Sequence, residues 1–361
     1  MGKTVTIKDV AARGGVSKTA VSYVLSGREV GVRISDETRR RVLAAAHDLG
    51  YHPNALARGL ARRQTDTLTL VMQFPAVFSG WSGFTNELMH GATDAATALG
   101  FDLMLHTKGL DSASQDAAAL TDGRADGALL VRDRDDPLPV CLTERDFPFV
   151  QIFSRPSVSS EIFASSYFVD CDNVAGAFLA VDYLWSLGHR RIGHLSGSME
   201  SAAAADRRQG YHEALATHGA QPNPEWECGM THAGSDFSPF CEMMSRPDSP
   251  TAIFAWSDDV AAQAIRVLRE SLGRRVPEDV SVLGFDGTQM CDHTTPRLSS
   301  IRQPVYEMAV RGVETLAALL RREPVPERHI IFTPTLSLRD SCAPCREPSL
   351  SRTITRIIKG E

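Results

Sequence analysis

The sequence predicts a small all-α domain at the N-terminus, followed by a larger α/β domain with two lobes. The chain has 361 residues, which is too long for one ordinary domain. Residues 1–63 hold 12 Lys or Arg and 5 Asp or Glu, a net charge of +7, whereas the remainder carries −13. Only helical periodicity is visible before Thr67, and strand-like apolar runs alternate with amphipathic segments after it. A basic helical domain of this kind suits a polyanionic partner.

The composition is that of an ordinary globular protein, with 43% hydrophobic and 23% charged residues. The seven cysteines are odd in number and scattered from Cys141 onward, which argues against a disulfide framework. Cys342 and Cys345 form one CxxC without further ligands nearby, so we expect neither a metal site nor a bound cofactor. No signal peptide or membrane span is visible, and the expected location is the cytoplasm.

The N-terminal region predicts two short helices joined by a tight turn. Thr6 and Asp9 have the spacing of a capping box at the start of the first helix. Gly14-Gly15 ends that helix, because glycine readily adopts the left-handed conformation that a tight turn requires. Ser17 is a suitable N-cap for the second helix. Two helices joined in this way form a helix-turn-helix unit.

The second helix of this unit presents small, polar and aromatic residues outward. They are Lys18, Thr19, Ser22, Tyr23 and Ser26. A recognition helix places such residues against base edges in the major groove, and its N-terminus favours a phosphate. From these features alone, an ordinary solvated helix pair remains an alternative.

A third helix and a short linker follow. Ser35 is a suitable N-cap, and Gly50 closes the helix. The residues expected to pack inward are Val42, Leu43, Ala46 and Leu49. The arginines at 39–41 either contact phosphates or form a solvated basic face. After Pro53, a helix-prone segment capped by Asn54 is too brief to be stable alone, so we expect it to form on a partner.

The stretches DVAARGGVSKTAVSYVLSG and SDETRRRVLAAAHDLGYHPNALARGLA, in this order before a strand, resemble the lactose and galactose repressor (LacI/GalR) family. The resemblance implies sequence-specific binding to DNA. It assigns base reading to Lys18, Thr19 and Tyr23, with Ser26 beside them. It assigns phosphate contacts to Thr6, Ser17 and Ser22. It also implies a hinge helix that includes Asn54, in which Leu60 wedges into the minor groove and Ala57 lets the helix approach it. Tyr23 departs from the arginine often found there, so the base preference stays open.

From Thr67 onward the sequence alternates strands and helices, which predicts parallel sheets with helices on both faces. The segment is too long for one sheet, and we expect two lobes. LGHRRIGHLSG and VSVLGFDG are landmarks of the same family, whose core is similar to periplasmic binding proteins. Two such lobes close on a small molecule by a hinge motion.

Candidate effector-binding residues lie near the ends of these strands, where ligands of parallel sheets bind. The family resemblance points to Arg207, Asp286, Ser257 and Asp258, and to the aromatic residues Trp81 and Phe84. A guanidinium and a carboxylate suit the hydroxyl groups of a sugar, and aromatic faces stack on sugar rings or purines. Each residue also has an ordinary structural interpretation, and Arg208 is the alternative if the register is shifted by one.

The expected domains are a helix-turn-helix headpiece (1–51), a hinge helix (52–64), a two-lobed effector-binding and dimerisation domain (65–340) and a flexible tail (341–361). The expected function is that of a repressor, active as a homodimer on a palindromic operator and controlled by a small molecule, a sugar or alternatively a nucleobase. The alternatives are a solute-binding protein of a transporter and an enzyme. The basic headpiece argues against the first, and the absence of GxSxG, P-loop and HExxH motifs argues against the second.

Overall fold

The computed structural model describes residues 5–26, 34–51, 64–72, 82–107, 109, 112–230 and 236–346. The chain divides into two compact units, Met1–Asp66 and Thr67–Glu361. The positions predicted for the hinge helix between 52 and 63, the aromatic residue Trp81 and the last part of the tail, 347–361, lie outside the described residues.

The first unit contains three helices within its described residues: α1 (Ile7–Gly14), α2 (Lys18–Ser26) and α3 (Asp36–Asp48). The predicted capping box is present, because the backbone N–H of Thr6 donates to Oδ2 of Asp9 at 2.8 Å. The turn between α1 and α2 also follows the prediction, with Gly15 in the left-handed conformation at a φ of 61°.

The core of the first unit joins one apolar face from each helix. Its buried side chains include Val10, Val21, Val24 and Val42. The expectation that Leu43 packs inward is wrong, since 50% of its surface is exposed. On α3 the buried stripe runs along Val42, Ala45 and Ala46, so the neighbouring position 43 is turned away from the core.

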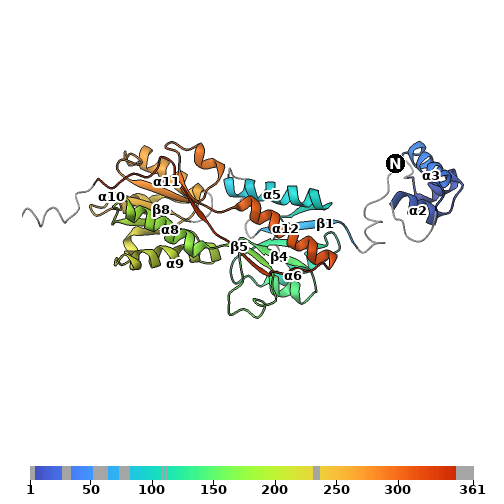
Figure 1. Cartoon of the computed structure of the whole chain (residues 1–361), viewed down its shortest axis with the longest axis horizontal. Helices are drawn as coiled ribbons and strands as arrows, with labels where there is room; N and C mark the ends of the chain where they lie inside the picture. Colours follow the sequence, from blue (N-terminus) through green and yellow to red (C-terminus); the bar gives the residue numbers. More distant parts are fainter. Residues whose placement is uncertain are drawn as a thin grey trace, which may run out of the picture. The chain divides into compact units, whose positions relative to one another are not determined.

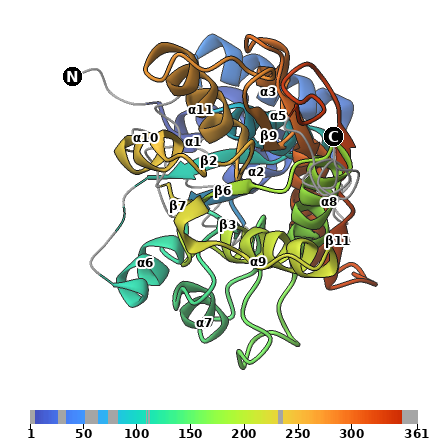
Figure 2. The same cartoon turned by 90° about the vertical axis from the view of Figure 1, so that its left-hand side faces the viewer.

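The second unit contains two α/β lobes (Figure 1). The first lobe consists of β1 (Thr67–Met72), α5 (Gly83–Leu99), β2 (Asp102–His106), α6 (Ala113–Leu120), β3 (Gly127–Val131), α7 (Leu138–Thr143), β4 (Phe149–Ile152), β5 (Phe168–Cys171), α12 (Val305–Arg321) and β11 (His329–Phe332). Its described strands form a parallel sheet in the order β2-β1-β3-β4-β5-β11. Helices α5 and α12 cover one face of this sheet, and α6 and α7 lie close together on the other (Figure 2).

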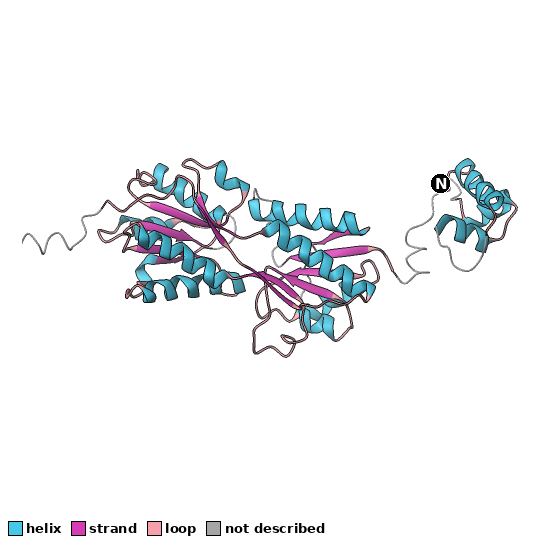
Figure 3. Cartoon of the chain, viewed as in Figure 1, coloured by secondary structure: helices cyan, strands magenta, loops and turns pink. Residues whose placement is uncertain are grey.

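The second lobe repeats this architecture. It consists of α8 (Asn173–Ser186), β6 (Ile192–Ser196), α9 (Ala202–Thr217), η2 (Pro224–Trp226), β7 (Glu227–Gly229), α10 (Ser238–Ser245), β8 (Ala252–Ala255), α11 (Asp258–Glu270), β9 (Ser281–Asp286), η3 (Gln289–Asp292), β10 (Ser299–Arg302) and β12 (Thr335–Ser337). Its described strands are ordered β7-β6-β8-β9-β10-β12, and only β12 among them is antiparallel to its neighbour. Figure 3 shows helices on both sides of each sheet, which confirms the predicted fold class.

The chain passes between the lobes three times, each time over a few residues. The crossings lie between β5 and α8, between β10 and α12, and between β11 and β12. Short parallel connections at one edge are suited to a hinge, because small backbone rotations there move whole lobes.

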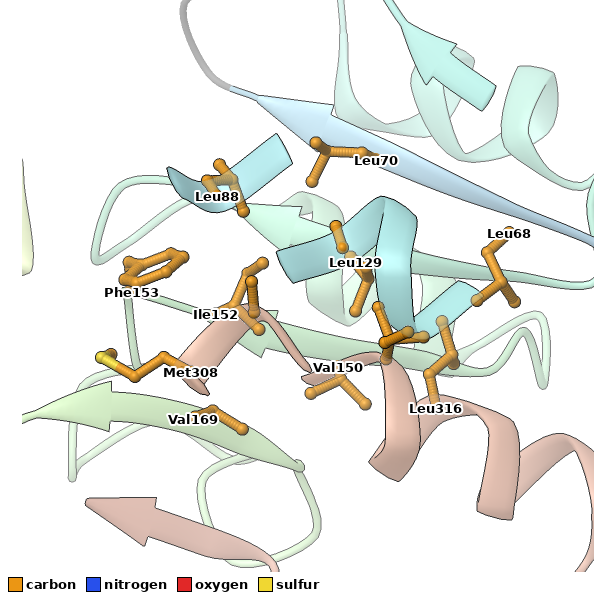
Figure 4. Packing of buried hydrophobic residues seen from close by; sticks show 14 of the residues in the cluster. Leu68, Leu70, Leu88, Leu129, Val150, Ile152, Phe153, Val169, Met308 and Leu316 are labelled. Carbon is orange, nitrogen blue, oxygen red and sulfur yellow. The ribbon is translucent and has the colours of Figure 1, made fainter. Parts of the chain in front are cut away.

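Buried aliphatic side chains fill the space between the sheet of the first lobe and helices α5 and α12 (Figure 4). Strand residues Leu68, Leu129 and Ile152 contribute from the sheet, and Met308 and Leu316 contribute from α12. This packing fixes the positions of the strand ends of the first lobe.

The expectation of a flexible tail from Ser341 is wrong for residues 341–346. The Ser341 hydroxyl donates to the carbonyl of Val282 at 2.6 Å and accepts from the backbone N–H of Ser299 at 2.8 Å. The Cys342 thiol donates to the same Val282 carbonyl at 3.3 Å, and Cys345 N–H donates to the carbonyl of Leu187 at 2.8 Å. These backbone groups of β9, of β10 and of the end of α8 give the polar segment enough partners to order it against the second lobe.

Candidate functional site

One face of α2 carries most of the residues proposed from the sequence to contact DNA. Ser17, Lys18, Thr19 and Ser22 are exposed, and Tyr23 is half-buried. The Ser17 hydroxyl accepts a hydrogen bond from the backbone N–H of Ala20 at 3.1 Å, so Ser17 caps this helix as predicted. The helix therefore presents a small polar surface next to its positive dipole end.

Other proposed DNA contacts differ in how far the structure defines them. The Thr6 hydroxyl donates to Oδ2 of Asp9 at 2.7 Å, so its donor is used within the capping box. Ser26 ends α2, and its side chain is outside the described residues. Asn54, Ala57 and Leu60 also lie outside the described residues.

Arg207, the sequence-proposed effector arginine on α9, is buried and held from several sides. Its Nε donates to Oδ1 of Asn173 at 2.9 Å, and its Nη1 donates to the carbonyl of Trp256. The guanidinium also lies 3.6 Å from the centre of the Phe285 ring. These contacts fix its orientation, whereas the neighbouring Arg208 pairs with Glu227 at the surface.

Asp286, at the end of β9, faces this arginine. One oxygen, Oδ1, lies 3.6 Å from Nη1 of Arg207 and accepts from Nε2 of Gln303 at 2.6 Å. The residue has a φ of 117°, a region that side chains other than glycine rarely adopt, and such strain is frequent at binding sites. Burial raises the pKa of Asp286 well above its ordinary value, although Arg207 acts to lower it.

Ser257 and Asp258 follow β8, as predicted, but both have structural partners. The Ser257 hydroxyl caps α11 by accepting from the backbone N–H of Val260 at 3.3 Å. The Asp258 carboxylate accepts from the Ser300 hydroxyl at 2.5 Å and from the N–H of Thr288 at 2.9 Å. Its second oxygen also accepts from the Cys291 thiol at 3.1 Å, and burial raises the pKa of Asp258 to about 6.

Phe84, in the first turn of α5, lies on the first lobe close to the lobe boundary. Its ring contacts Phe153 edge-on with a centroid distance of 4.8 Å. The preceding residue Gly83 is so close to Thr288 of the second lobe that an added Cβ would collide with its side chain. Trp81, the other aromatic candidate, is outside the described residues.

Sequence reasoning missed a group of ion pairs that joins the two lobes. Asp206 on α9, only 6% exposed at its side chain, accepts from Nη2 of Arg134 at 2.6 Å and from Nη2 of Arg155 at 2.5 Å. Both arginines follow strands of the first lobe, β3 and β4. The run RDRDD after β3 and the SRP after β4 stand at strand ends, which is the signal that could have identified them.

Three further buried polar residues at the strand ends were also missed. Asn173, at the start of α8, receives the hydrogen bond from Arg207. Burial raises the pKa of Asp170 on β5 to about 6, and Arg155, whose Nε is 3.8 Å away, acts to lower it. Ser154, directly after β4, is buried, and its hydroxyl has no hydrogen-bond partner among the described residues. The site therefore draws polar groups from the strand ends of both lobes.

Two kinds of feature are absent from the part of the chain that the structure describes. No group of three or more His, Cys, Asp or Glu residues there is arranged to hold a metal ion. Among the helices of the same ranges, none has the length and apolar character needed to cross a membrane.

Two family models match the chain. The model for bacterial regulatory proteins of the lacI family matches residues 6–54, which include α1, α2 and α3. The model for a periplasmic binding protein-like domain matches residues 181–342, which include most of the second lobe and α12.

The chain is also similar to characterised proteins over nearly its whole length. It is 34% identical to the HTH-type transcriptional regulator CelR of Thermobifida fusca, over 93% of this chain and 98% of that protein. A solved structure of a CelR–cellobiose complex matches with 31% identity and a TM-score of 0.70, over 93% of this chain and 99% of that one. A lac repressor dimer bound to operator and an anti-inducer matches with 26% identity and a TM-score of 0.80, over 94% and 100%.

Proposed function

Since this chain belongs to the LacI family of bacterial regulatory proteins, we propose that it is a transcriptional repressor whose affinity for operator DNA is controlled by a sugar. The observation that carries the proposal is the exposed polar face of α2, on a compact unit that is joined to a two-lobed domain. Regulation is the function of the relatives, and we propose no enzymatic activity. Because the proposed partner is operator DNA, the proposed location of the protein is the cytoplasm.

We assign direct base contacts to Lys18, Thr19 and Tyr23 on α2, with Ser26 beside them. Lysine donates to guanine O6 and N7, and the threonine methyl group suits the methyl group of thymine. Tyrosine offers a hydroxyl and an aromatic face in place of the guanidinium common at its position. The proposed operator therefore differs at that base step from operators that are read by arginine.

We assign backbone contacts to Ser17, Ser22 and Thr6. Ser17 and Ser22 are exposed at the N-terminal half of α2, where a phosphate is favoured by the helix dipole. Thr6 can donate to a phosphate only after its hydroxyl leaves Asp9. These contacts position the helix in the groove and carry no sequence information themselves.

The hinge segment supplies the remaining proposed contacts, through Asn54, Ala57 and Leu60. Two such segments, one from each subunit, meet at the centre of a palindromic operator. Leu60 inserts between base pairs and kinks the duplex, which provides further contact area between protein and DNA.

The effector site is proposed to lie around Arg207 and Asp286. The guanidinium donates to, and the carboxylate accepts from, neighbouring hydroxyl groups of a sugar. The buried Ser154 hydroxyl is a further candidate contact, and Phe84 and Trp81 are proposed to stack on the ring.

Asp258 and Ser257 are proposed to support this site rather than to bind the sugar directly. Both Asp258 oxygens already accept hydrogen bonds from protein groups, and Ser257 caps α11. Loss of Asp258 would release Thr288 and Ser300, which hold the loop that follows Asp286.

A sugar bound between the lobes changes the angle between them, and the three short connections serve as the hinge. In a homodimer this change alters the spacing of the two hinge segments and shifts the DNA-bound population. The shift is limited by the difference between the sugar's affinities for the two conformations. The CelR–cellobiose complex supports a saccharide as the ligand class, and a nucleobase is the alternative.

Two measurements test this proposal. Duplexes selected from a randomised pool should bind the purified protein with an affinity that falls steeply with salt, and they should be palindromic. The melting temperature should rise with cellobiose, glucose or ribose in a screen that also contains guanine and hypoxanthine. The same sugar should change the affinity for the selected duplex. Failure to enrich any duplex would refute repressor function, and a response to purines alone would refute the sugar.

A further inference from the structure

We infer that Arg41 on α3 is a positioning residue for DNA reading, because its guanidinium holds the turn between α1 and α2 and thereby sets the orientation of α2. The inference rests on the proposed operator binding and adds a specific residue to it. It concerns contacts within the headpiece, away from the residues assigned above to bases and phosphates.

The guanidinium of Arg41 binds the carbonyl groups at the end of α1. Its Nε and Nη2 donate to the Gly14 carbonyl at 3.1 and 2.7 Å, and Nη2 also donates to the Gly15 carbonyl at 3.1 Å. Carbonyl groups at a helix C-terminus have no partner within the helix and attract a positive charge. One side chain from α3 thus satisfies two of these carbonyls at the point where the chain turns into α2.

The glycines of the turn show how closely the guanidinium packs. A Cβ added at Gly15 would lie 2.6 Å from Nη2 of Arg41, and the φ of this residue is already 61°. At Gly14 the nearest atom to an added Cβ is Cγ2 of Val16, at an ordinary 3.6 Å. Only the second glycine is therefore required, both by its backbone conformation and by the arginine that lies against it.

The three consecutive arginines of α3 consequently divide into two groups. All three are exposed to solvent, but the side chains of Arg39 and Arg40 make no hydrogen bond or ion pair with another described residue. The Arg41 side chain donates three hydrogen bonds to carbonyl groups of the turn. Arg40 is therefore a matched control, since it carries the same charge on the same helix without this contact.

The competing explanation is that Arg41 contacts a DNA phosphate. The two roles have different signatures. Loss of a phosphate contact weakens binding to all sequences equally and lowers the slope of log affinity against log salt by about 1. Loss of a positioning contact leaves the number of neutralised phosphates unchanged and disturbs base contacts, so it reduces affinity for the operator more than for unrelated DNA.

The experiment compares R41M, R41K and R40M with the wild-type full-length protein. The probes are a fluorescent duplex selected with the wild type and a scrambled duplex of equal composition, titrated at salt concentrations between about 50 and 200 mM. We expect R41M to lose about tenfold or more in affinity for the selected duplex, with a smaller loss for the scrambled one and an unchanged salt slope. R41K should recover part of the loss, because its ammonium group can donate to Gly14, and R40M should lose less than R41M.

Equal losses on both duplexes, a slope lowered by about 1, or an R40M effect as large as that of R41M would each overturn the inference. Hydrogen exchange of the α1 and α3 amides shows whether R41M remains folded. If R41M unfolds, the R41K variant provides the test. An R41K protein that again prefers the selected duplex over the scrambled one supports the positioning role of Arg41. An R41K protein that is as stable as the wild type but lacks this preference refutes it. If the wild type selects no duplex, the proposed function itself fails, which is a different result.

Discussion

The carboxylate of Asp206 on α9 lies 2.5 Å from Nη2 of Arg155, which belongs to the opposite lobe. A second guanidinium of that lobe, from Arg134, approaches the same carboxylate at 2.6 Å. Arg207, the proposed effector contact, is the next residue along the helix. The proposed sugar site and the charged connection between the lobes are thus carried by adjacent residues, so a change in the lobe angle acts on both.

We predict that Asp206→Asn weakens the association of the lobes. The substitution removes the carboxylate that pairs with both arginines, and only Arg155 keeps another one, Asp170 at 3.8 Å. The free energy of unfolding should fall by about 1–2 kcal/mol, a value reduced here because both arginines are partly exposed to solvent. Small-angle scattering should show a larger radius of gyration for the variant in the absence of sugar. Denaturant titration measures the stability change.

The matched control is Asp122→Asn, which removes an exposed pair with Arg124 inside one lobe. It should alter neither the radius of gyration nor the stability by a measurable amount. If both variants behave alike, Asp206 has no special part in holding the lobes together.

We predict that Arg207→Lys reduces the affinity for the sugar identified by thermal shift by at least about tenfold, while the protein remains folded. A lysine keeps the charge near Asp286 but cannot donate two parallel hydrogen bonds. Isothermal titration calorimetry measures the affinity. Arg208→Lys is the control, because Arg208 points to Glu227 at the surface. A larger effect at Arg208 would show that the effector arginine was assigned to the wrong position.

The outline of the fold was predictable because its signals are local. The helix-turn-helix follows from Gly15, from the cap at Ser17 and from the apolar faces of short helices. The central strands appear in the sequence as continuous apolar runs, because a parallel sheet that is covered on both faces buries every side chain of its central strands. Strands β7 (ECG), β10 (SSIR), β11 (HIIF) and β12 (TLS) were not predicted, because segments this short carry little pattern of their own and acquire partners only through the sheet.

The site was predictable only in part, because its contacts are distant in the sequence. The family resemblance indicated Arg207 and Asp286, which the structure brings within 3.6 Å. Asp258 has the same position after a strand, yet it binds the side chain of Ser300, 42 residues further on. The neighbouring sequence does not distinguish a carboxylate that faces the site from one whose oxygens already accept hydrogen bonds from other protein groups.

We predict that the stability of the wild type relative to Asp170→Asn falls as the pH rises from about 4 to about 6. Burial raises the pKa of Asp170 to about 6 in the folded state, whereas an unfolded aspartate titrates near its ordinary value of 3.8. Between these values the folded state retains a proton that the unfolded state has released, so each rise in pH favours unfolding.

Denaturant titrations of both proteins between about pH 4 and 7 measure this difference, which changes by at most about 1.4 kcal/mol per pH unit. Asparagine resembles the protonated acid and does not titrate, so the remaining groups cancel in the comparison. Parallel curves for the two proteins would mean that Asp170 is already ionised at pH 4, through its interaction with Arg155.

We predict that Leu60→Ala lowers the affinity for the selected operator by on the order of tenfold or more and reduces the bend of the DNA, because a wedge between base pairs buries a full leucine side chain. Unfolding and sugar binding of the isolated protein should be unchanged. Leu56→Ala removes the same atoms at the preceding leucine of the segment and serves as the control. Fluorescence anisotropy measures the affinity, and energy transfer between dyes at the duplex ends measures the bend. If the two variants had equal effects, or if the bend were unchanged with Leu60→Ala, the loss of affinity would belong to the hinge segment in general. The proposal that Leu60 inserts between base pairs would then be refuted.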